Sequence, residues 1–551
     1  MRPLPLVAYS LSLAAWWAIC GRVFQSQENE PQSLITIFDG KLDDKDAPDH
    51  PVRGDGARSS TLHKTQVQKT LNEQQPSEHL ASIETKSEAS QAQAQLVLSS
   101  NLEIMDRPDG CPDSWRPYHT LLTGQGSTYN GWQSRIMYYH WKKQKAIGGR
   151  CSEMTGFTRI CPSPNAEPDG LEKFIPSVFV RSLTNQELAP YGGYGVLNRP
   201  FSVVEFFKRP DYVARIREKF VLICETDHVL MQPMPNLAGP DDDPYAYGHS
   251  FSYMHAGSHH DEIIRYCWPK GSHQGMQPVG PSPLFIRKSQ LAALAPMWLN
   301  CSYTLRGRPE PAQKIQDWVL EMWGYNIAAT ANGIRHVSKR IQLEPGAHGF
   351  RGGFENDFYI FHYTYGIEMT LQGMPQGHMQ IGEWSMDKRH YGGSYPPRDF
   401  GSYPPPKAAA PTSFWLFNAW SEAIKDAGDT WPDSYALGPI GWRRVPATAA
   451  QINASPIGSK ILNTHWTWAG IKTLSFLQNG NLRTPWGEGK WGIMQSKVRG
   501  FAECDPPAGK ECIFLDFSGA QHHAVFDLAN GSFLSLRMGD MEQVKGRRIS
   551  G

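Results

Sequence analysis

The chain has 551 residues, too many for one ordinary domain, which indicates two or three folded units joined by linkers. Its 54 basic and 53 acidic side chains leave a formal net charge of +1, with no long basic stretch. This balance argues against a protein that is drawn to nucleic acid by its overall field. Nine cysteines occur without a CxxC pair, so a zinc cluster is not expected and disulfides in an oxidising compartment are the alternative.

The N-terminus begins with an uncharged run from Pro3 to Cys20. As a helix this run spans about 27 Å, which is barely enough for the core of a bilayer. Trp16 and Trp17 lie near its end, and such bulky residues suit a membrane interface better than a cleavage site. We therefore expect residues 1–22 to form an uncleaved signal anchor, with a cleaved signal peptide and a secreted form as the alternative.

A polar stretch follows the apolar run. No aromatic residue occurs between Phe38 and Trp115, and the stretch is rich in Ser, Gln, Glu, Lys and Asp. Such a composition buries too little apolar surface to fold alone. Residues 23–110 are thus expected to be a disordered stem that holds a lumenal unit away from the membrane, as in a single-pass type II protein.

Residues 111–400 alternate between short apolar runs and helical patterns, which predicts an α/β domain. The clearest run is 220–225, which is bounded by charge as buried parallel strands are. The strands expected in chain order are 118–123, 177–180, 220–225, 245–251, 283–286 and 358–362. The expected helices are 138–145, 200–208 and 313–331.

The last part of the chain has a different pattern. Residues 401–457 are expected to be a Pro-rich connector with a helix, and residues 458–551 to be a small antiparallel β-domain. Asn479-Gly480 and Asn530-Gly531 are typical hairpin turns of such a domain. Its Trp-rich strands suit either a packed core or a sugar-binding face, and the core is the favoured interpretation.

Carboxylates stand where the clearest strand ends. Glu225 and Asp227 follow the apolar run directly, and carboxylates at a strand exit typically hold a divalent cation beside a diphosphate. His362 ends another apolar run and is a second candidate ligand. The alternatives are a solvated turn for Asp227 and a structural role for His362. His228 is expected to be a turn residue or a supporting neighbour.

Nine sets of short segments then resemble one family, the plant and green-algal peptidyl hydroxyproline O-arabinosyltransferases. They occur in the order of that family over roughly residues 115 to 400, and the segments at 318–322, 362–366 and 381–389 are the most specific. The sets are 119–123 with 132–133, 156–159, 197–200, 225–228 with 235–238, 278–280 with 282–283, 296–300, 318–322, 362–366, and 381–384 with 387–389.

The resemblance implies a GT-A-like, Rossmann-like glycosyltransferase core that uses a UDP-sugar donor and a divalent cation, expected to be Mn²⁺. It further implies transfer of L-arabinofuranose to peptidyl hydroxyproline of wall glycoproteins such as extensins, by an enzyme anchored in the Golgi membrane. The related peptidyl serine α-galactosyltransferases are expected to carry Asp-x-Asp where this chain has Glu225-Thr-Asp227, which favours the arabinosyl interpretation. Transfer of galactose or another sugar to serine or hydroxyproline is the second hypothesis. An inactive, lectin-like binding protein is the third.

The resemblance also implies which side chains bind the donor. Asp227 and His362 would hold the cation, with Glu225 near the ribose or the metal. Thr120, Thr123 and Gln133 would contact the uridine, where the first strand meets the first helix. Arg199 would contact the diphosphate or the base, and a surface ion pair is the alternative for it.

Two further residues are candidates for catalysis. Lys388 would offset the charge on the leaving UDP. Glu321 lies among aromatic residues on the predicted helix, where a buried acid suits a base or a stabiliser of an oxocarbenium-like state. A buried structural carboxylate is the alternative for Glu321. Intact Glu225, Asp227, His362 and Lys388 argue against the inactive, lectin-like interpretation.

Overall fold

The computed structural model describes residues 105–549, with gaps at 239–244, 316, 346–352, 378–380, 435, 469–470, 485–486, 495–510, 518–519 and 538–542. The predicted anchor and the stem up to residue 104 lie outside the described residues. Within that described range, no helix is long and apolar enough to cross a membrane, so the expectation of a membrane partner is corrected.

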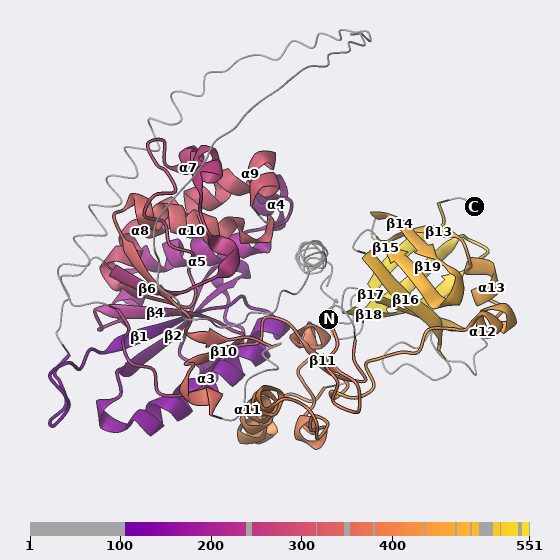
Figure 1. The fold of residues 1–551 in the computed structure, drawn as a ribbon, viewed down its shortest axis with the longest axis horizontal. Coiled ribbons are helices and arrows are strands. Elements are labelled where there is room, and N and C mark those ends of the chain that lie inside the picture. Colours follow the sequence, from indigo (N-terminus) through magenta and orange to yellow (C-terminus); the bar gives the residue numbers. More distant parts are fainter. Residues whose placement is uncertain are drawn as a thin grey trace, which may run out of the picture.

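A seven-stranded sheet organises the first unit, in the order β3-β2-β1-β4-β7-β6-β8 (Figure 1). β1, β2, β3 and β4 are parallel, whereas β7 runs antiparallel to both of its neighbours. The strands are β1 (Tyr118–Thr123), β2 (Met154–Ser163), β3 (Ser177–Arg181), β4 (Phe220–Glu225), β6 (Tyr245–His249), β7 (Leu284–Arg287) and β8 (Arg335–Lys339).

Helices cover both faces of this sheet, because successive strand residues point to opposite sides. Leu121 of β1 packs with Trp298 of α8 on one face, and Leu122 packs with Trp141 of α3 on the other. Figure 1 shows α5, α8 and α10 on the first side and α3 on the second. The helices are α3 (Thr128–Gly148), α4 (Asn185–Leu188), α5 (Asn198–Phe207), α6 (Pro210–Val213), α7 (Asp261–Cys267), α8 (Lys288–Arg306), α9 (Pro309–Lys314) and α10 (Leu320–Ala331).

Two small sheets extend this unit beyond β4. One contains β5 (His228–Leu230), β10 (Ile360–His362) and β9 (Gln342–Leu343), and the other pairs β11 (Ile367–Met369) with β12 (Trp384–Met386). The short helix η11 (Lys388–Tyr391) follows β12. They share an apolar core with α11 (Pro411–Ala427), so the segment predicted as a connector packs into the first unit.

The C-terminal part is an eight-stranded antiparallel meander, which confirms the predicted β-domain. Trp466 near its start bridges Arg548 near its end, so the sheet nearly closes on itself. Trp466, Trp468 and Trp491 are buried inside, as the core interpretation requires. After α12 (Ala449–Ala454) and α13 (Gly458–Ile461) come β13 (His465–Trp468), β14 (Ile471–Phe476), β15 (Asn481–Thr484), β16 (Gly487–Met494), β17 (Cys512–Phe517), β18 (Ala520–Asp527), β19 (Ser532–Arg537) and β20 (Gln543–Arg547).

Two described disulfides join parts of the first unit. Cys111 pairs with Cys151, and Cys267 pairs with Cys301. Cys161 lies close to Cys151 in the sequence, but it is a buried free thiol on β2. The first disulfide instead joins two cysteines with a sequence separation of 40.

Candidate active site

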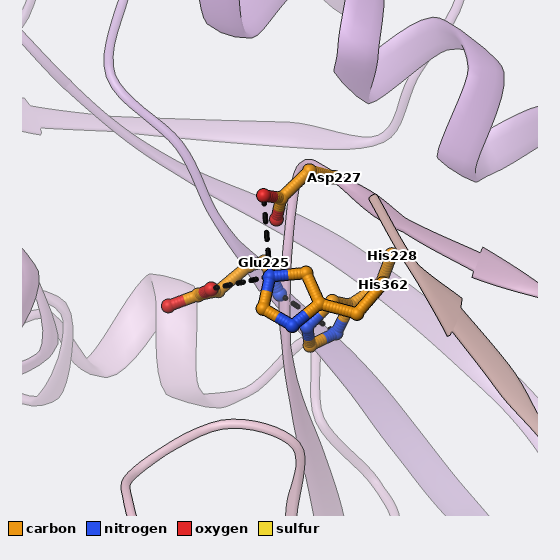
Figure 2. Close-up of side chains that lie close together, drawn as sticks. All are labelled: Glu225, Asp227, His228 and His362. Atoms are coloured by element: carbon orange, nitrogen blue, oxygen red, sulfur yellow. Dashed lines mark hydrogen bonds and ion pairs between the residues drawn. The ribbon is translucent and has the colours of Figure 1, made fainter. Parts of the chain in front are cut away.

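Four side chains that could bind a cation meet at the carboxyl end of β4. β4 ends at Glu225, and a two-residue turn through Asp227 leads into β5 at His228. β10 lies antiparallel to β5 and places His362 directly opposite His228. One ligand atom from each of the four residues lies within 4.8 Å of the others, and Figure 2 shows both carboxylates facing His362.

The chemistry of these groups fits a divalent cation. His362 Nε2 lies 3.3 Å from Asp227 Oδ2 and 3.8 Å from Glu225 Oε2. Two carboxylates and an imidazole form a donor set for metals such as Mn²⁺ or Zn²⁺. The backbone N–H of Glu225 donates to His228 Nδ1 at 3.3 Å, which places the proton of a neutral His228 on Nε2. His228 therefore supports the turn, and Glu225, Asp227 and His362 are the residues that would hold the ion.

Lys388 enters this cluster from η11. Its Nζ lies 2.5 Å from Asp227 Oδ2, and its side chain is only 6% exposed. Burial alone raises the pKa of Asp227, but Lys388 and His362 outweigh burial and hold that pKa well below its usual range. For Lys388 burial lowers the pKa, and Asp227 more than reverses the effect. Both groups are thus charged at neutral pH.

Arg199 links the cluster to Glu321. The guanidinium of Arg199, in the first turn of α5, contacts Glu225 and also donates to Glu321 Oε2 at 3.2 Å. Glu321 is 1% exposed, and burial raises its pKa to about 7 despite the nearby Arg199. Its second oxygen, Oε1, has no hydrogen-bond partner among the described residues. A continuous series of charges results, in the order Lys388, Asp227, His362, Glu225, Arg199 and Glu321.

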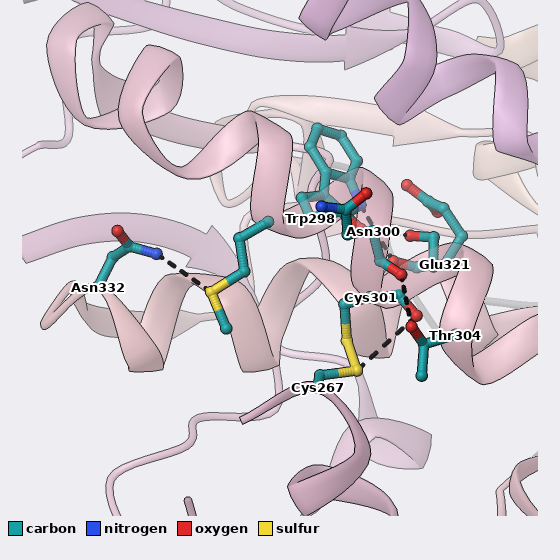
Figure 3. The surroundings of a disulfide bond; sticks show 9 residues. Cys267, Trp298, Asn300, Cys301, Thr304, Glu321 and Asn332 are labelled. Atoms are coloured by element: carbon teal, nitrogen blue, oxygen red, sulfur yellow. Dashed lines mark hydrogen bonds between the residues drawn. A yellow bond between two sulfur atoms is a disulfide. The ribbon is translucent and has the colours of Figure 1, made fainter. Parts of the chain in front are cut away.

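Helix α8 supports Glu321 through a hydrogen bond to its backbone. The indole N–H of Trp298 donates to the backbone oxygen of Glu321 at 3.2 Å. Figure 3 shows Trp298 on the same helix as Cys301, whose disulfide to Cys267 ties α8 to α7. The position of the buried carboxylate therefore depends on α8 as well as on its own helix, α10.

The residues predicted to contact uridine lie at different depths. Thr123 ends β1 beside Glu225 in the sheet, and its hydroxyl donates to the backbone oxygen of Cys224 at 3.4 Å. Thr120 lies deeper in β1, where its hydroxyl accepts the indole N–H of Trp141. Gln133 is buried on α3 and donates to the backbone oxygen of Tyr129. Thr123 adjoins the cluster, and uridine contact by all three stays a prediction.

Sequence reasoning missed two supports of the cluster. Gln342 of β9 contacts His362 Nδ1 at 3.2 Å, on the ring side opposite the carboxylates. Tyr363 donates its backbone N–H to the oxygen of Asp227 and its hydroxyl to the oxygen of Thr226, which fixes the turn. Tyr363 directly follows His362, so its position next to a predicted metal ligand was the signal that could have identified it. Nothing in the sequence pointed to Gln342.

The α/β sheet, the candidate cation site at the end of β4 and the lysine against it lie in the part of the chain that is similar to named glycosyltransferases, and the protein is a glycosyltransferase. Residues 118–338 match the model described as the hydroxyproline O-arabinosyltransferase family N-terminal domain, and residues 359–432 match its C-terminal domain. The chain belongs to the hydroxyproline O-arabinosyltransferase family, which confirms the resemblance seen in the sequence.

The match to two named relatives covers most of the length of each relative. Hydroxyproline O-arabinosyltransferase RDN2 of Medicago truncatula is 38% identical over 313 residues, which are 55% of this chain and 79% of the relative. Hydroxyproline O-arabinosyltransferase 3 of Arabidopsis thaliana is 40% identical over 298 residues, 53% and 76% of the two chains. Residues 433–551, which include the β-domain, lie outside both family models.

Among solved structures, the galactosyltransferase LgtC with donor and acceptor sugar analogues shares 10% identity at a TM-score of 0.27. The match covers 45% of this chain and 87% of that one.

Proposed function

We propose that this glycosyltransferase moves L-arabinofuranose from a UDP donor to peptidyl hydroxyproline in secreted, hydroxyproline-rich proteins. The names of both relatives state hydroxyproline O-arabinosyl transfer, which supports the sugar and the acceptor. The observation that carries the proposal is the cluster of Glu225, Asp227 and His362, with Lys388 against it, inside the part of the chain that matches the family.

Glu225, Asp227 and His362 would hold the divalent cation, for which we propose Mn²⁺. When bound, such an ion neutralises the negative charge of the donor diphosphate. The residues themselves prepare the site for it. Asp227 stays ionised because Lys388 and His362 lower its pKa, and Tyr363 fixes the turn that carries it.

Lys388 and Arg199 supply fixed positive charge on two sides of the cluster. Lys388 lies at the Asp227 side, where an ammonium stabilises charge that develops on the leaving UDP. Arg199 lies at the Glu225 side, where a guanidinium binds a diphosphate with two parallel hydrogen bonds. Because both cations are already in place, little reorganisation is needed when the bond to UDP breaks.

Glu321 has a different role in this proposal from the one that the sequence suggested. Its carboxylate is sealed from solvent and contacts Arg199. We therefore assign it to hold Arg199, in place of the predicted base or oxocarbenium stabiliser.

The test is sugar transfer by the purified full chain with Mn²⁺ and a hydroxyproline-rich peptide. UDP-arabinofuranose, UDP-galactose and UDP-xylose are supplied in parallel, and UDP release and peptide mass are followed. A pentose gain with UDP-arabinofuranose alone, lost in Asp227→Asn, is the expected result. Transfer from another donor only would establish the galactosyl or other-sugar alternative. UDP binding without transfer from any donor would contradict enzymatic function and favour the binding-protein alternative.

We further propose residence in the lumen of the Golgi. The disulfides Cys111–Cys151 and Cys267–Cys301 support an oxidising compartment. Imaging of the tagged full chain beside a Golgi marker tests this, and exclusive overlap with a cytosolic marker would contradict it.

A further inference from the structure

Lys388 is held by a short segment that is almost entirely buried. Asp387 caps η11, since its carboxylate accepts the backbone N–H of Arg389 at 2.8 Å and the side-chain Nε–H of Arg389 at 2.6 Å. The backbone N–H of His390 also donates to the oxygen of Asp387 at 3.1 Å. Lys388 therefore lies in a turn whose backbone is tied on both sides.

A buried chain of hydrogen bonds fixes the far end of that turn. Ser385 Oγ lies 2.9 Å from Glu368 Oε1 and 2.7 Å from His390 Nε2. Ser385 donates to Glu368, and because a hydroxyl has one hydrogen to donate, it accepts from His390. The second oxygen of Glu368 accepts the backbone N–H of Gly382 at 2.7 Å. His390 is thus locked to the β11–β12 hairpin.

A tryptophan from the following segment closes over His390. The ring of Trp442 stacks on His390 with centroids 4.2 Å apart and planes 8° from parallel. The same ring meets Tyr391 edge-on at 5.9 Å. Just before it, the oxygen of Pro439 accepts the backbone N–H of Ser385. The segment that leads to the β-domain is therefore part of the support of η11.

The β-domain itself reaches this support. Strand β18 lies against η11. Cys512 and Leu536 of the β-domain belong to the same apolar cluster as Tyr391 and Trp442. They stand on the outer face of the sheet, whereas neighbouring residues such as Val544 fill its interior. The β-domain is consequently packed against the segment that carries Lys388.

We propose that the C-terminal β-domain is a positioning element of the active site, which holds Lys388 in place through Trp442, His390 and the Ser385–Glu368 chain. The proposal rests on the role of Lys388 in the proposed function, but not on the identity of the sugar. It gives residues 433–551, which the family models do not cover, a part in the reaction. Loss of the support would misplace the ammonium while the donor site remains assembled.

The first experiment follows lysine reactivity in the full chain, without donor, metal or turnover. An amine-directed acylating reagent is applied, and labelling is read by mass spectrometry at Lys388 and at Lys288. Lys288 is a matched internal control, because it is 8% exposed and donates to the oxygen of Ile216 on the remote side of the main sheet. Labelling of both lysines together would report general unfolding.

Three variants should raise labelling of Lys388 severalfold and leave Lys288 unchanged: Ser385→Ala, Trp442→Ala and Leu536→Ala. Two controls should behave as the wild type. Trp442→Phe keeps a ring on His390, and Val544→Ala trims a buried side chain on the interior face of the next strand. Unchanged labelling of Lys388, or labelling that rises in step with Lys288, overturns the proposal.

Kinetics then separate positioning from general support. For the transferred sugar, Ser385→Ala and Trp442→Ala should lower kcat about tenfold with the donor KM within twofold, since small misplacements of a catalytic group are costly. In a Lys388→Ala background the same changes should have no further effect on kcat. Equal losses of kcat in the wild-type background and in the Lys388→Ala background would overturn the proposal. Absence of transfer by the wild type would contradict the proposed function, and the labelling experiment would still decide this inference.

Discussion

Lys388 Nζ lies 2.5 Å from Asp227 Oδ2, although the two residues are 161 positions apart in the chain. The first comes from η11 after the β11–β12 hairpin, and the second from the turn after β4. Both side chains are nearly buried. The ammonium group of Lys388 is therefore already paired with the Asp227 carboxylate that the divalent cation would use.

Lys388→Met should tighten binding of Mn²⁺ in the absence of donor. The substitution removes a competing cation from Asp227, and we expect the dissociation constant to fall about tenfold, equivalent to about 1.4 kcal/mol. Calorimetric titration of the full chain measures it. Lys288→Met is the control, because that buried lysine contacts a backbone oxygen far from the cluster. An unchanged dissociation constant in Lys388→Met would show that lysine and metal do not compete.

Asp227→Asn should cost stability as well as activity. It leaves the Lys388 ammonium buried without its carboxylate, a loss of about 3–5 kcal/mol in the free energy of unfolding. The double variant Asp227→Asn with Lys388→Met should regain much of it, because both charges are then absent. Urea unfolding of the wild type, of Asp227→Asn, of Lys388→Met and of the double variant gives the comparison. Additive losses in the double variant would mean that the two side chains are not coupled.

Local patterns predicted five of the seven strands of the main sheet, and β2 (Met154–Ser163) and β8 (Arg335–Lys339) were not predicted. The runs 118–123 and 220–225 coincide with β1 and β4, because each is an apolar run bounded by residues that end a strand. Helix α8 was not predicted, and Pro296 in its interior argues against a helix by local rules. Burial of Trp298 and its neighbours against the sheet outweighs that local cost. The helix predicted at 313–331 is interrupted, since α9 ends at Lys314 and α10 begins at Leu320.

The site was predictable only where a motif was local. Glu225 and Asp227 could be found because they follow their strand directly, and His362 because it ends another. The links Lys388–Asp227 and Arg199–Glu321 depend on the packing of distant segments, so the sequence without a family resemblance offers no signal for either pair. For the same reason the contact of the β-domain with η11 was not foreseen.

Removing the Cys267–Cys301 disulfide should destabilise the protein and disturb the site. The bond closes a loop with a sequence separation of 34, for which loop entropy predicts a loss of about 3–4 kcal/mol in the free energy of unfolding. Because α8 also supports Glu321 through Trp298, kcat of the folded Cys267→Ala/Cys301→Ala variant should fall. Thermal unfolding and UDP release measure the two effects.

The Cys111–Cys151 pair is a matched control for that experiment, with a similar separation of 40. It joins the segment before β1 to the end of α3, where none of the proposed site residues lies. Its removal should cost similar stability and leave kcat of the folded protein unchanged. Equal losses of kcat in both double variants would argue against a specific link between α8 and Glu321.

Glu321 should make stability fall as the pH rises through the weakly acidic range. Burial raises the pKa of the folded-state carboxyl to about 7, from an ordinary value of 4.5. Between these values the folded protein keeps a proton that the unfolded chain has lost, so stability decreases with pH, and above pH 7 the effect is complete. The shift corresponds to roughly 3 kcal/mol. Glu321→Gln should abolish this component, which urea unfolding at pH 4.5, 6 and 8 would measure.

Glu218→Gln provides a control of opposite sign. Burial tends to raise the pKa of Glu218, but His119 at 3.0 Å outweighs it, so the pKa is lowered. The stability from Glu218 is therefore present above its unfolded pKa and lost as pH falls through its folded pKa. Its removal should make stability less sensitive to acid, whereas Glu321→Gln removes a component that weakens the protein as pH rises. A pH profile of Glu321→Gln parallel to the wild type would show that Glu321 is ionised throughout, held so by Arg199.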